Sequence, residues 1–471
     1  MDNKEILKKF NPSTGMSRRD AIKFMGISPI AASVLASTAG SSIAEASEDV
    51  SGKIVIVGGG AGGIMALSRL YRAIKNPDIT IIAPNEVHLY QPGQVFVGAG
   101  ELKIEDLAID NNNYIDQSKV TWIKDEVATF DADNNSLVTR SGEKVKYDFL
   151  VVAAGLQYHY EAIEGLTKED IGTNGITSVY LNDLEKGTAK GATATWEWFN
   201  DLKEAAKTGK PKVIYTQPNT PIKCGGAPQK MLYLSADYLR QDGLSAEYSF
   251  VSSAGKLFSL PAIDKALHEV QDGYDKIENR FQHHLKSIDV KNKKATFIHA
   301  WDEEEYDEDF DTTEIVSHAD TVVMDYDFIH IVPPMSPVDA VMNSSLISKA
   351  GWLEVDKHSL QHTRYKNVFG IGDICGIPMG KTGGTARHHG PILTQNLISA
   401  MKGEELKAVF DGYTVCPIKT QYGKIIMAEF NFDGPAPTMP LDFSKPRWMW
   451  WAFDLYMLEP MYKYLMLTGR F

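Results

Sequence analysis

The pattern of apolar and polar positions becomes regular shortly after residue 50. The apolar run Ile54–Val57 predicts a buried strand, and the segment after Gly63 alternates in the way of an amphipathic helix. The same order of strand, loop and helix returns in PKVIYTQPNTPIKCGGAPQKMLYLSADYLR, residues 211–240. Two such units predict an α/β protein with two Rossmann-like dinucleotide-binding units in tandem.

The loop between the first strand and helix carries three spaced glycines. Gly58, Gly60 and Gly63 form G-x-G-x-x-G, and Ala61 opens the helix. The first glycine permits a tight turn, the second lets the backbone approach a pyrophosphate, and the third lets helix and strand pack closely. The helix N-terminus then stabilises the phosphate charge. The alternative is a glycine turn with a purely structural role.

Two later strands complete the expected cofactor domain. YDFLVVAAGLQ contains Ala154 and Gly155, and KNVFGIGDICGIP runs into Gly372 and Asp373. In two-dinucleotide flavoproteins, which these stretches resemble, the aspartate contacts the ribityl chain of FAD. The second strand ends in Ala83, where an acidic residue usually holds the ribose, so the sequence leaves the ribose contact open.

Composition separates the first part of the chain from the rest. The 471 residues carry a formal net charge of −13 without a long basic run, which excludes nucleic acid as an expected partner. Arg18 and Arg19 precede an Ala- and Ser-rich stretch, although Ala21 stands where twin-arginine signals usually have Phe. This layout predicts a twin-arginine export signal and a protein on the periplasmic face of the cytoplasmic membrane. A disordered or amphipathic N-terminus is the alternative.

The expected parts of the chain follow from these signals. They are an export signal over 1–46, a discontinuous FAD-binding domain over 53–185 and 331–420, a second Rossmann-like domain over 186–330, and a C-terminal region at the quinone and membrane interface over 421–471.

The second unit lacks the glycine motif that would bind a nicotinamide dinucleotide and carries a cysteine instead. Cys224 lies in NTPIKCGGAPQK, and Cys375 lies in the loop after a strand of the first unit. In the two-dinucleotide architecture these loops meet at the isoalloxazine ring, so we expect the two cysteines to form a redox-active disulfide. Two unrelated buried thiols are the alternative.

At this point the chain resembles the sulfide:quinone oxidoreductases. YTQPNTPIKCGGAPQK, HIVPPMSPVDAV, NVFGIGDICGIPMGKTGG and DGYTVCPIKTQYGKIIMAEF match the family's blocks in order. The resemblance implies that hydrosulfide is oxidised at a Cys224–Cys375 pair, that electrons pass through FAD to a membrane quinone, and that Cys416 is structural. It leaves open which cysteine carries the persulfide.

Other functions remain as alternatives. The flavoprotein subunit of flavocytochrome c sulfide dehydrogenase shares this chemistry but tethers FAD through a cysteine, and no cysteine lies between Ala83 and Gly100. We therefore expect non-covalent FAD. A type-two NADH:quinone reductase is disfavoured by the missing second glycine motif, and a non-enzymatic sulfur-binding flavoprotein is the remaining alternative.

Polar residues after Asp373 are candidates to stabilise the reduced flavin and to relay protons at the quinone. Lys381 and Thr382 open a helix whose N-terminus would stabilise an anionic reduced flavin. His388 on this helix is a candidate proton relay beside a quinone, or else a packing residue. We expect no metal site.

The end of the chain is rich in aromatic residues. Trp448, Trp450 and Trp451, together with Phe430, predict contact with a quinone or with the membrane surface. Packing of this segment on its own domain, or on a second copy in a homo-oligomer, is the alternative.

Overall fold

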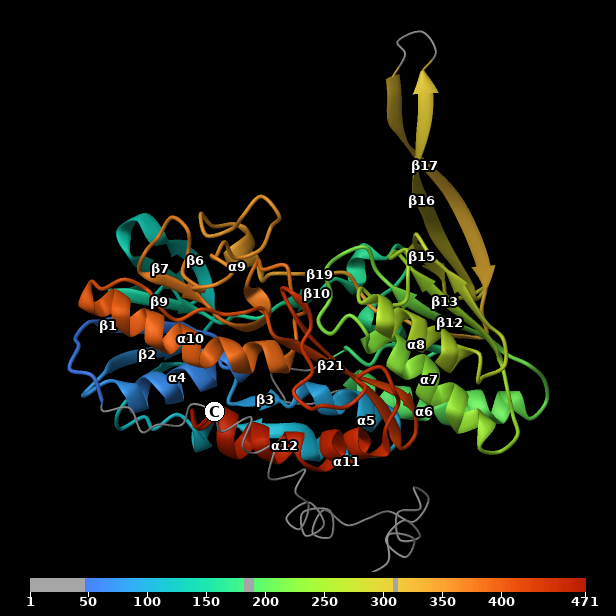
Figure 1. Cartoon of the computed structure of the whole chain (residues 1–471), viewed down its shortest axis with the longest axis horizontal. Helices are drawn as coiled ribbons and strands as arrows, with labels where there is room; N and C mark the ends of the chain where they lie inside the picture. Colours follow the sequence, from blue (N-terminus) through green and yellow to red (C-terminus); the bar gives the residue numbers. More distant parts are fainter. Residues whose placement is uncertain (1–46, 182–189, 308–311) are drawn as a thin grey trace, which may run out of the picture.

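The computed structural model describes residues 47–181, 190–307 and 312–471. The segment in which we expect an export signal lies outside these residues. Figure 1 shows two α/β units side by side, a long hairpin that extends from one of them, and a C-terminal segment that runs along both.

The first unit is built on a five-stranded parallel sheet. The apolar run that the sequence marks as a strand forms its centre, with buried side chains on both faces. Helices α4 and α10 pack against each other beside it (Figure 1). The order of strands in the sheet is β20 (Val368–Gly370), β9 (Phe149–Val152), β1 (Lys53–Val57), β2 (Asp78–Ile82) and β5 (Thr121–Ile123); α4 spans Ala61–Ala73 and α10 spans Gly383–Lys402.

The second unit holds another five-stranded parallel sheet. Its order is β11 (Ile176–Thr177), β18 (Phe328–His330), β12 (Lys212–Gln217), β13 (Glu247–Ser252) and β14 (Ile277–Arg280). The helices of this unit are α6 (Lys190–Ala206), α7 (Ala227–Arg240) and α8 (Pro261–Gln271). Both expected Rossmann-like units are therefore present.

Antiparallel strands extend this core. Strands β15 (His283–Asp289), β16 (Lys294–Asp307) and β17 (Thr312–Asp325) form an antiparallel sheet, and β16 and β17 are the hairpin that projects in Figure 1. Strands β21 (Thr414–Gln421), β22 (Lys424–Asn431) and β23 (Gly434–Pro435) form a sheet that packs on α7. The shorter elements are β3 (Val87–Leu89), α5 (Gln94–Gly98), β4 (Ala108–Asp110), β6 (Val127–Asp131), β7 (Ser136–Thr139), β8 (Lys144–Lys146), β10 (Gln157–Tyr158), β19 (Met335–Ser336) and α9 (Asp339–Met342).

The C-terminal segment consists of α11 (Trp448–Tyr456), α12 (Leu458–Met461) and a π-helical turn over Tyr462–Met466. Hydrogen bonds hold it to the body. The hydroxyl of Tyr462 lies 2.6 Å from Nε2 of His88, and the hydroxyl of Ser68 donates to the carbonyl of Leu467 at 2.6 Å. Within the described residues, no helix combines the length and apolar character needed to cross a membrane.

Close packing of the loop after β1 explains why Gly58 and Gly63 are glycines. Gly58 has φ +120°, and a Cβ there would lie 2.3 Å from the carbonyl oxygen of Ala153. A Cβ at Gly63 would lie 1.8 Å from the carbonyl oxygen of Gly58. The loop therefore folds tightly between β1 and β9 only with glycine at both positions.

We predict that Gly58→Ala lowers the free energy of unfolding by at least ~2 kcal/mol, because the new methyl group meets backbone atoms at a strained φ. Thermal unfolding followed by circular dichroism measures this loss. Gly209→Ala is the matched control, since nothing lies within 4 Å of its Cβ position and its φ is ordinary. Equal melting temperatures for the two variants would contradict the role of Gly58.

Candidate active site

The glycine loop and the start of α4 form a cradle for a phosphate. No side chain caps α4, whose N-cap is Gly60 and whose first residue is Ala61, and its first turn holds no acidic residue. Nothing lies within 4 Å of the Cβ position of Gly60 or of Gly155, which follows Ala154 at the end of β9. Open space beside unpaired helix N–H groups fits the pyrophosphate of a dinucleotide.

The end of β20 adds polar groups to the same side of the sheet. Gly372 has φ +80° and donates its N–H to Nδ1 of His389 at 3.2 Å. His389 is fully buried, its Nε2 has no hydrogen-bond partner, and burial lowers its pKa to about 3, so the ring is neutral. Burial also raises the pKa of Asp373, which Lys381 and Lys223 oppose. An orphaned buried nitrogen and a carboxylate beside the cradle fit a bound flavin dinucleotide.

The position after β2 shows what replaces the usual acidic residue. Ala83 lies against Gly59, and a Cβ added at Gly59 would lie 2.6 Å from the Cβ of Ala83. Asn111 donates through Nδ2 to the carbonyl oxygens of Gly59 and Asn85, both at 3.0 Å, and its Oδ1 contacts Nδ1 of His88 at 2.7 Å. No sequence motif marks Asn111, because it follows β4 and reaches the glycine loop only through the tertiary fold.

The cysteines are arranged differently from our expectation. Cys224 Sγ lies 3.1 Å from Cys416 Sγ, and neither cysteine forms a disulfide. Cys416 is on β21, which packs against α7, and a Cβ at Gly226 would lie 3.0 Å from its sulfur. The small residues after Cys224 therefore make room for the second cysteine.

The structure places Cys224 beside Cys416, and the redox pairing that we expected between Cys224 and Cys375 stays a prediction. Cys375 lies in a separate apolar cluster with Leu353 and Val355, and burial raises its pKa to about 12. The loops of the two units do meet, since the N–H of Cys224 donates to the carbonyl of Lys381 at 2.8 Å. The Cys375 side chain, however, points into the core of the first unit, so the cysteine that we expected to be structural is the one beside Cys224.

A hydrogen bond from Cys416 and nearby lysines favour the ionised form of the half-buried Cys224. The hydrogen bond from Cys416 lowers the pKa of Cys224 most, and Lys230 and Lys419 lower it further against the effect of burial. Lys230 Nζ donates to Cys224 Sγ at 3.0 Å. The hydrogen bond to Cys224 raises the pKa of Cys416, and burial raises it further. The pair therefore divides into a thiolate, Cys224, and a thiol, Cys416. Cys224 itself has φ +54°, which is uncommon outside glycine.

Buried positive charge extends from this pair towards the dinucleotide cradle. The lysines Lys223, Lys230, Lys381 and Lys419 are all buried. Burial lowers the pKa of both Lys223 and Lys381 to about 8. Lys381 Nζ donates to the carbonyl oxygens of Asp373 at 2.7 Å and Cys375 at 3.0 Å. This concentration of ammonium groups favours anions, among them hydrosulfide, a thiolate and a reduced flavin.

The start of α10 matches its expected form. Thr382 is the N-cap, and its hydroxyl accepts a hydrogen bond from the N–H of Thr385 at 3.1 Å. Further along the helix, His388 stacks on Tyr413 with ring centroids 4.2 Å apart, and burial lowers its pKa to about 4. Tyr413 donates to Glu429 at 2.5 Å, next to Phe430. Whether His388 relays protons stays a prediction.

The three tryptophans of the C-terminal segment do not share one environment. Trp450 and Trp451 are buried, and Trp451 packs edge-on against Phe96 with centroids 5.1 Å apart. Trp448 is 43% exposed and Tyr464 is 66% exposed. Packing on the body, the alternative weighed from the sequence, therefore accounts for Trp450 and Trp451.

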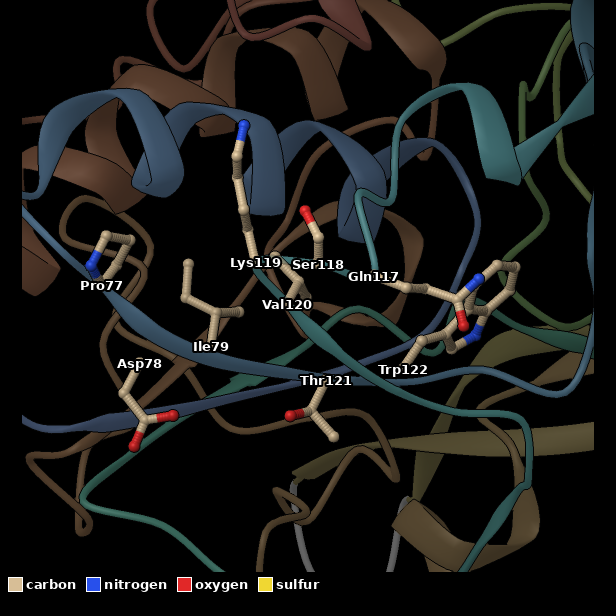
Figure 2. A pocket seen from close by; sticks show the side chains of 9 residues that line it. All are labelled: Pro77, Asp78, Ile79, Gln117, Ser118, Lys119, Val120, Thr121 and Trp122. Carbon is tan, nitrogen blue, oxygen red and sulfur yellow. The ribbon is translucent and has the colours of Figure 1, made fainter.

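A separate cavity lies at the amino end of strands β2 and β5 in the first sheet. Figure 2 shows side chains from Pro77 to Ile79 and from Gln117 to Trp122 around it. These residues lie where β2 and β5 begin, whereas the glycine loop follows the carboxyl end of β1 in the same parallel sheet. The cavity is therefore separate from the candidate active site. Across the part of the chain that the structure describes, no three His, Cys, Asp or Glu side chains gather as metal ligands.

Comparison with known proteins gives a consistent result. Residues 52–190 match the family model described as pyridine nucleotide-disulphide oxidoreductase. The chain is similar to the mitochondrial sulfide:quinone oxidoreductases of Dictyostelium discoideum (38% identity, 89% of this chain and 86% of the relative) and Mus musculus (34%, 88% and 86%). Its fold matches the crystal structure of the Aquifex aeolicus sulfide:quinone oxidoreductase with a TM-score of 0.67 at 20% identity, over 89% of this chain and 91% of that one.

These relatives contradict the expected cellular location. Three of them, including one from Schizosaccharomyces pombe, are named as mitochondrial, which overturns the twin-arginine export and the periplasmic location that we expected. Arg18 and Arg19 followed by an Ala- and Ser-rich stretch do not discriminate, because organelle transit peptides are also rich in Arg and Ser.

We predict that iodoacetamide at pH 7 modifies Cys224 in the reduced native protein and leaves Cys375 unmodified until the chain is unfolded. The thiolate is the reactive form, and the pKa shifts of the two cysteines have opposite signs. Mild oxidation with diamide should join Cys224 to Cys416. Peptide mapping by mass spectrometry reads both results; a Cys224–Cys375 link or rapid labelling of Cys375 would contradict this arrangement.

Proposed function

The chain belongs to the sulfide:quinone oxidoreductase family, and we propose that it oxidises hydrosulfide at Cys224 and Cys416 and reduces a membrane quinone. The observation that carries this proposal is the 3.1 Å contact of the two sulfur atoms beside the Lys230 ammonium group. A disulfide needs its sulfurs about 2 Å apart, so the pair closes with a small movement.

The pKa values of the two cysteines suggest which one receives the sulfide sulfur. When the pair is a disulfide, hydrosulfide attacks Cys416, the bond between the cysteines breaks, and a new sulfur–sulfur bond makes Cys416 a persulfide. Cys224 leaves as the thiolate, because Lys230 and Lys419 stabilise its charge and a thiol of lower pKa leaves faster. The proton of hydrosulfide passes to solvent or to a nearby base.

The second half of the cycle restores the pair. A second nucleophile, such as another hydrosulfide, takes the outer sulfur of the persulfide and leaves both cysteines reduced. When bound, FAD would supply the two-electron oxidation that re-forms the disulfide and the reduction of the quinone. Gly58, Gly60 and Gly63 would hold its pyrophosphate, Asp373 its ribityl chain, and the buried Lys381 favours its anionic form.

The exposed face of the C-terminal segment supports attachment to a membrane surface. A quinone with a long apolar tail stays in the bilayer, so the enzyme must reach it there. Trp448 and Tyr464 present aromatic rings to solvent in the same segment, and aromatic rings favour the headgroup region. Burying these rings would stabilise attachment by roughly 1–2 kcal/mol each.

We predict that Cys224→Ser and Cys416→Ser each reduce sulfide-dependent quinone reduction at least ~100-fold while FAD stays bound, because a disulfide needs both sulfurs. The two losses should not add in the double variant. Quinone reduction is followed with sulfide and, separately, with NADH as donor.

Cys375→Ser is the matched control and should keep most of the activity. Full activity of Cys416→Ser, loss of activity in Cys375→Ser, or turnover with NADH but not with sulfide would overturn the proposed function.

For the membrane surface, we predict that the double variant Trp448→Glu and Tyr464→Glu binds liposomes several-fold more weakly, while sulfide still reduces the flavin at the normal rate. Sedimentation with quinone-containing liposomes measures the binding. Tyr71→Glu removes another exposed ring, on α4, and serves as the control. Unchanged sedimentation of the double variant would point instead to an oligomer or packing role for these rings.

A further inference from the structure

A chain of buried hydrogen bonds joins the C-terminal segment to the glycine loop. The hydroxyl of Tyr462 lies 2.6 Å from Nε2 of His88, and Nδ1 of His88 lies 2.7 Å from Oδ1 of Asn111. Asn111 in turn donates through Nδ2 to the carbonyl oxygens of Gly59 and Asn85, both at 3.0 Å. Tyr462, His88 and Asn111 are all buried, so these hydrogen bonds form out of water.

The two carbonyl groups at one end fix the direction of every hydrogen bond in the chain. A carbonyl oxygen only accepts, so the amide nitrogen of Asn111 faces Gly59, and Oδ1 of Asn111 must accept from His88. Nδ1 of His88 therefore carries the proton, and Nε2 accepts from the hydroxyl of Tyr462. Burial lowers the pKa of His88 to about 4, which keeps the ring in this neutral form.

The last hydrogen bond of the chain acts on the peptide group between Gly59 and Gly60. In a trans peptide the carbonyl and the N–H point in opposite directions. By holding the carbonyl of Gly59, the amide of Asn111 therefore also directs the N–H of Gly60. Gly60 is the N-cap of α4, and nothing lies within 4 Å of its Cβ position. Its N–H thus points away from Asn111 and is one of the donors that the start of α4 offers to a phosphate.

Other hydrogen bonds dock the C-terminal segment on the same unit. Ser68 on α4 donates to the carbonyl of Leu467 at 2.6 Å, and Tyr114 donates to the carbonyl of Lys463 at 3.2 Å. Neither of these contacts involves the side chain of Asn111. They hold the segment in place, whereas the chain of hydrogen bonds described above also reaches the glycine loop.

We propose that Tyr462, His88 and Asn111 are positioning residues for FAD, because together they hold the Gly59–Gly60 peptide in the orientation that turns the N–H of Gly60 to the phosphate cradle. The C-terminal segment then helps to retain the cofactor, in addition to the membrane contact proposed above. This role concerns FAD alone, so it does not depend on the proposed sulfur chemistry.

The test is the dissociation constant of FAD, measured by diluting the holoenzyme and following the release of FAD by its fluorescence. We expect Tyr462→Phe, which removes only the hydroxyl oxygen, to raise this constant about fivefold, the effect of losing one buried hydrogen bond. Asn111→Ala should raise it at least as much. In the Asn111→Ala background, Tyr462→Phe should have no further effect, because Tyr462 acts through Asn111.

Two variants provide matched controls. Tyr114→Phe and Ser68→Ala each remove one docking hydrogen bond outside the chain, and the segment stays docked by its other contacts, so both should leave the constant unchanged. Tyr462→Phe keeps the ring that packs 5.1 Å from the ring of Tyr90, which guards against misfolding.

An unchanged constant in Tyr462→Phe, an equal loss in Tyr114→Phe, or additive losses in the double variant would overturn the role of the chain. Release of FAD needs no turnover of sulfide or quinone. Its result is therefore separate from that of the donor assay that tests the proposed function.

Discussion

The attraction between buried ammonium groups and one thiolate is the interaction on which the arrangement of this molecule depends. Lys230 contacts the sulfur of Cys224, and three further lysines, Lys223, Lys381 and Lys419, are also buried. Ammonium groups out of water are costly unless anions accompany them. The two α/β units, the sheet of β21 and the helix α11 each supply part of the enclosure that makes these charges effective.

The cofactor side of the site could be read from the sequence because its signals are local. Gly58, Gly60 and Gly63 act within one turn; the backbone demands glycine at Gly58 and Gly63, and open space lies beside Gly60. The same holds for the paired Rossmann-like units, since each consists of a strand, a loop and a helix that follow one another along the chain. A few consecutive residues are therefore enough to identify such elements.

The contact between Cys224 and Cys416 could not be predicted in this way. Which sulfur meets Cys224 depends on how β21 crosses α7, and that packing is fixed by contacts between residues far apart in the chain. Cys375 and Cys416 both follow or lie on strands near the interface, so their sequence surroundings look equally suitable. The contact of Asn111 with the glycine loop also depends on residues far apart in the chain. In the C-terminal segment, the burial of Trp450 and the exposure of Trp448 depend on which face of α11 meets the body.

Strand β20 pairs with β9, although most of the second unit lies between them in the chain. A ribosome that adds about 5–20 residues per second needs roughly ten to forty seconds to make the intervening segment. During that time one edge of β9 has no partner, and unpaired strand edges invite aggregation. The second unit is complete before the first can close, and β21 with Cys416 emerges later still. Assembly of this enzyme is therefore ordered in time, with the sulfur site among the last parts to form.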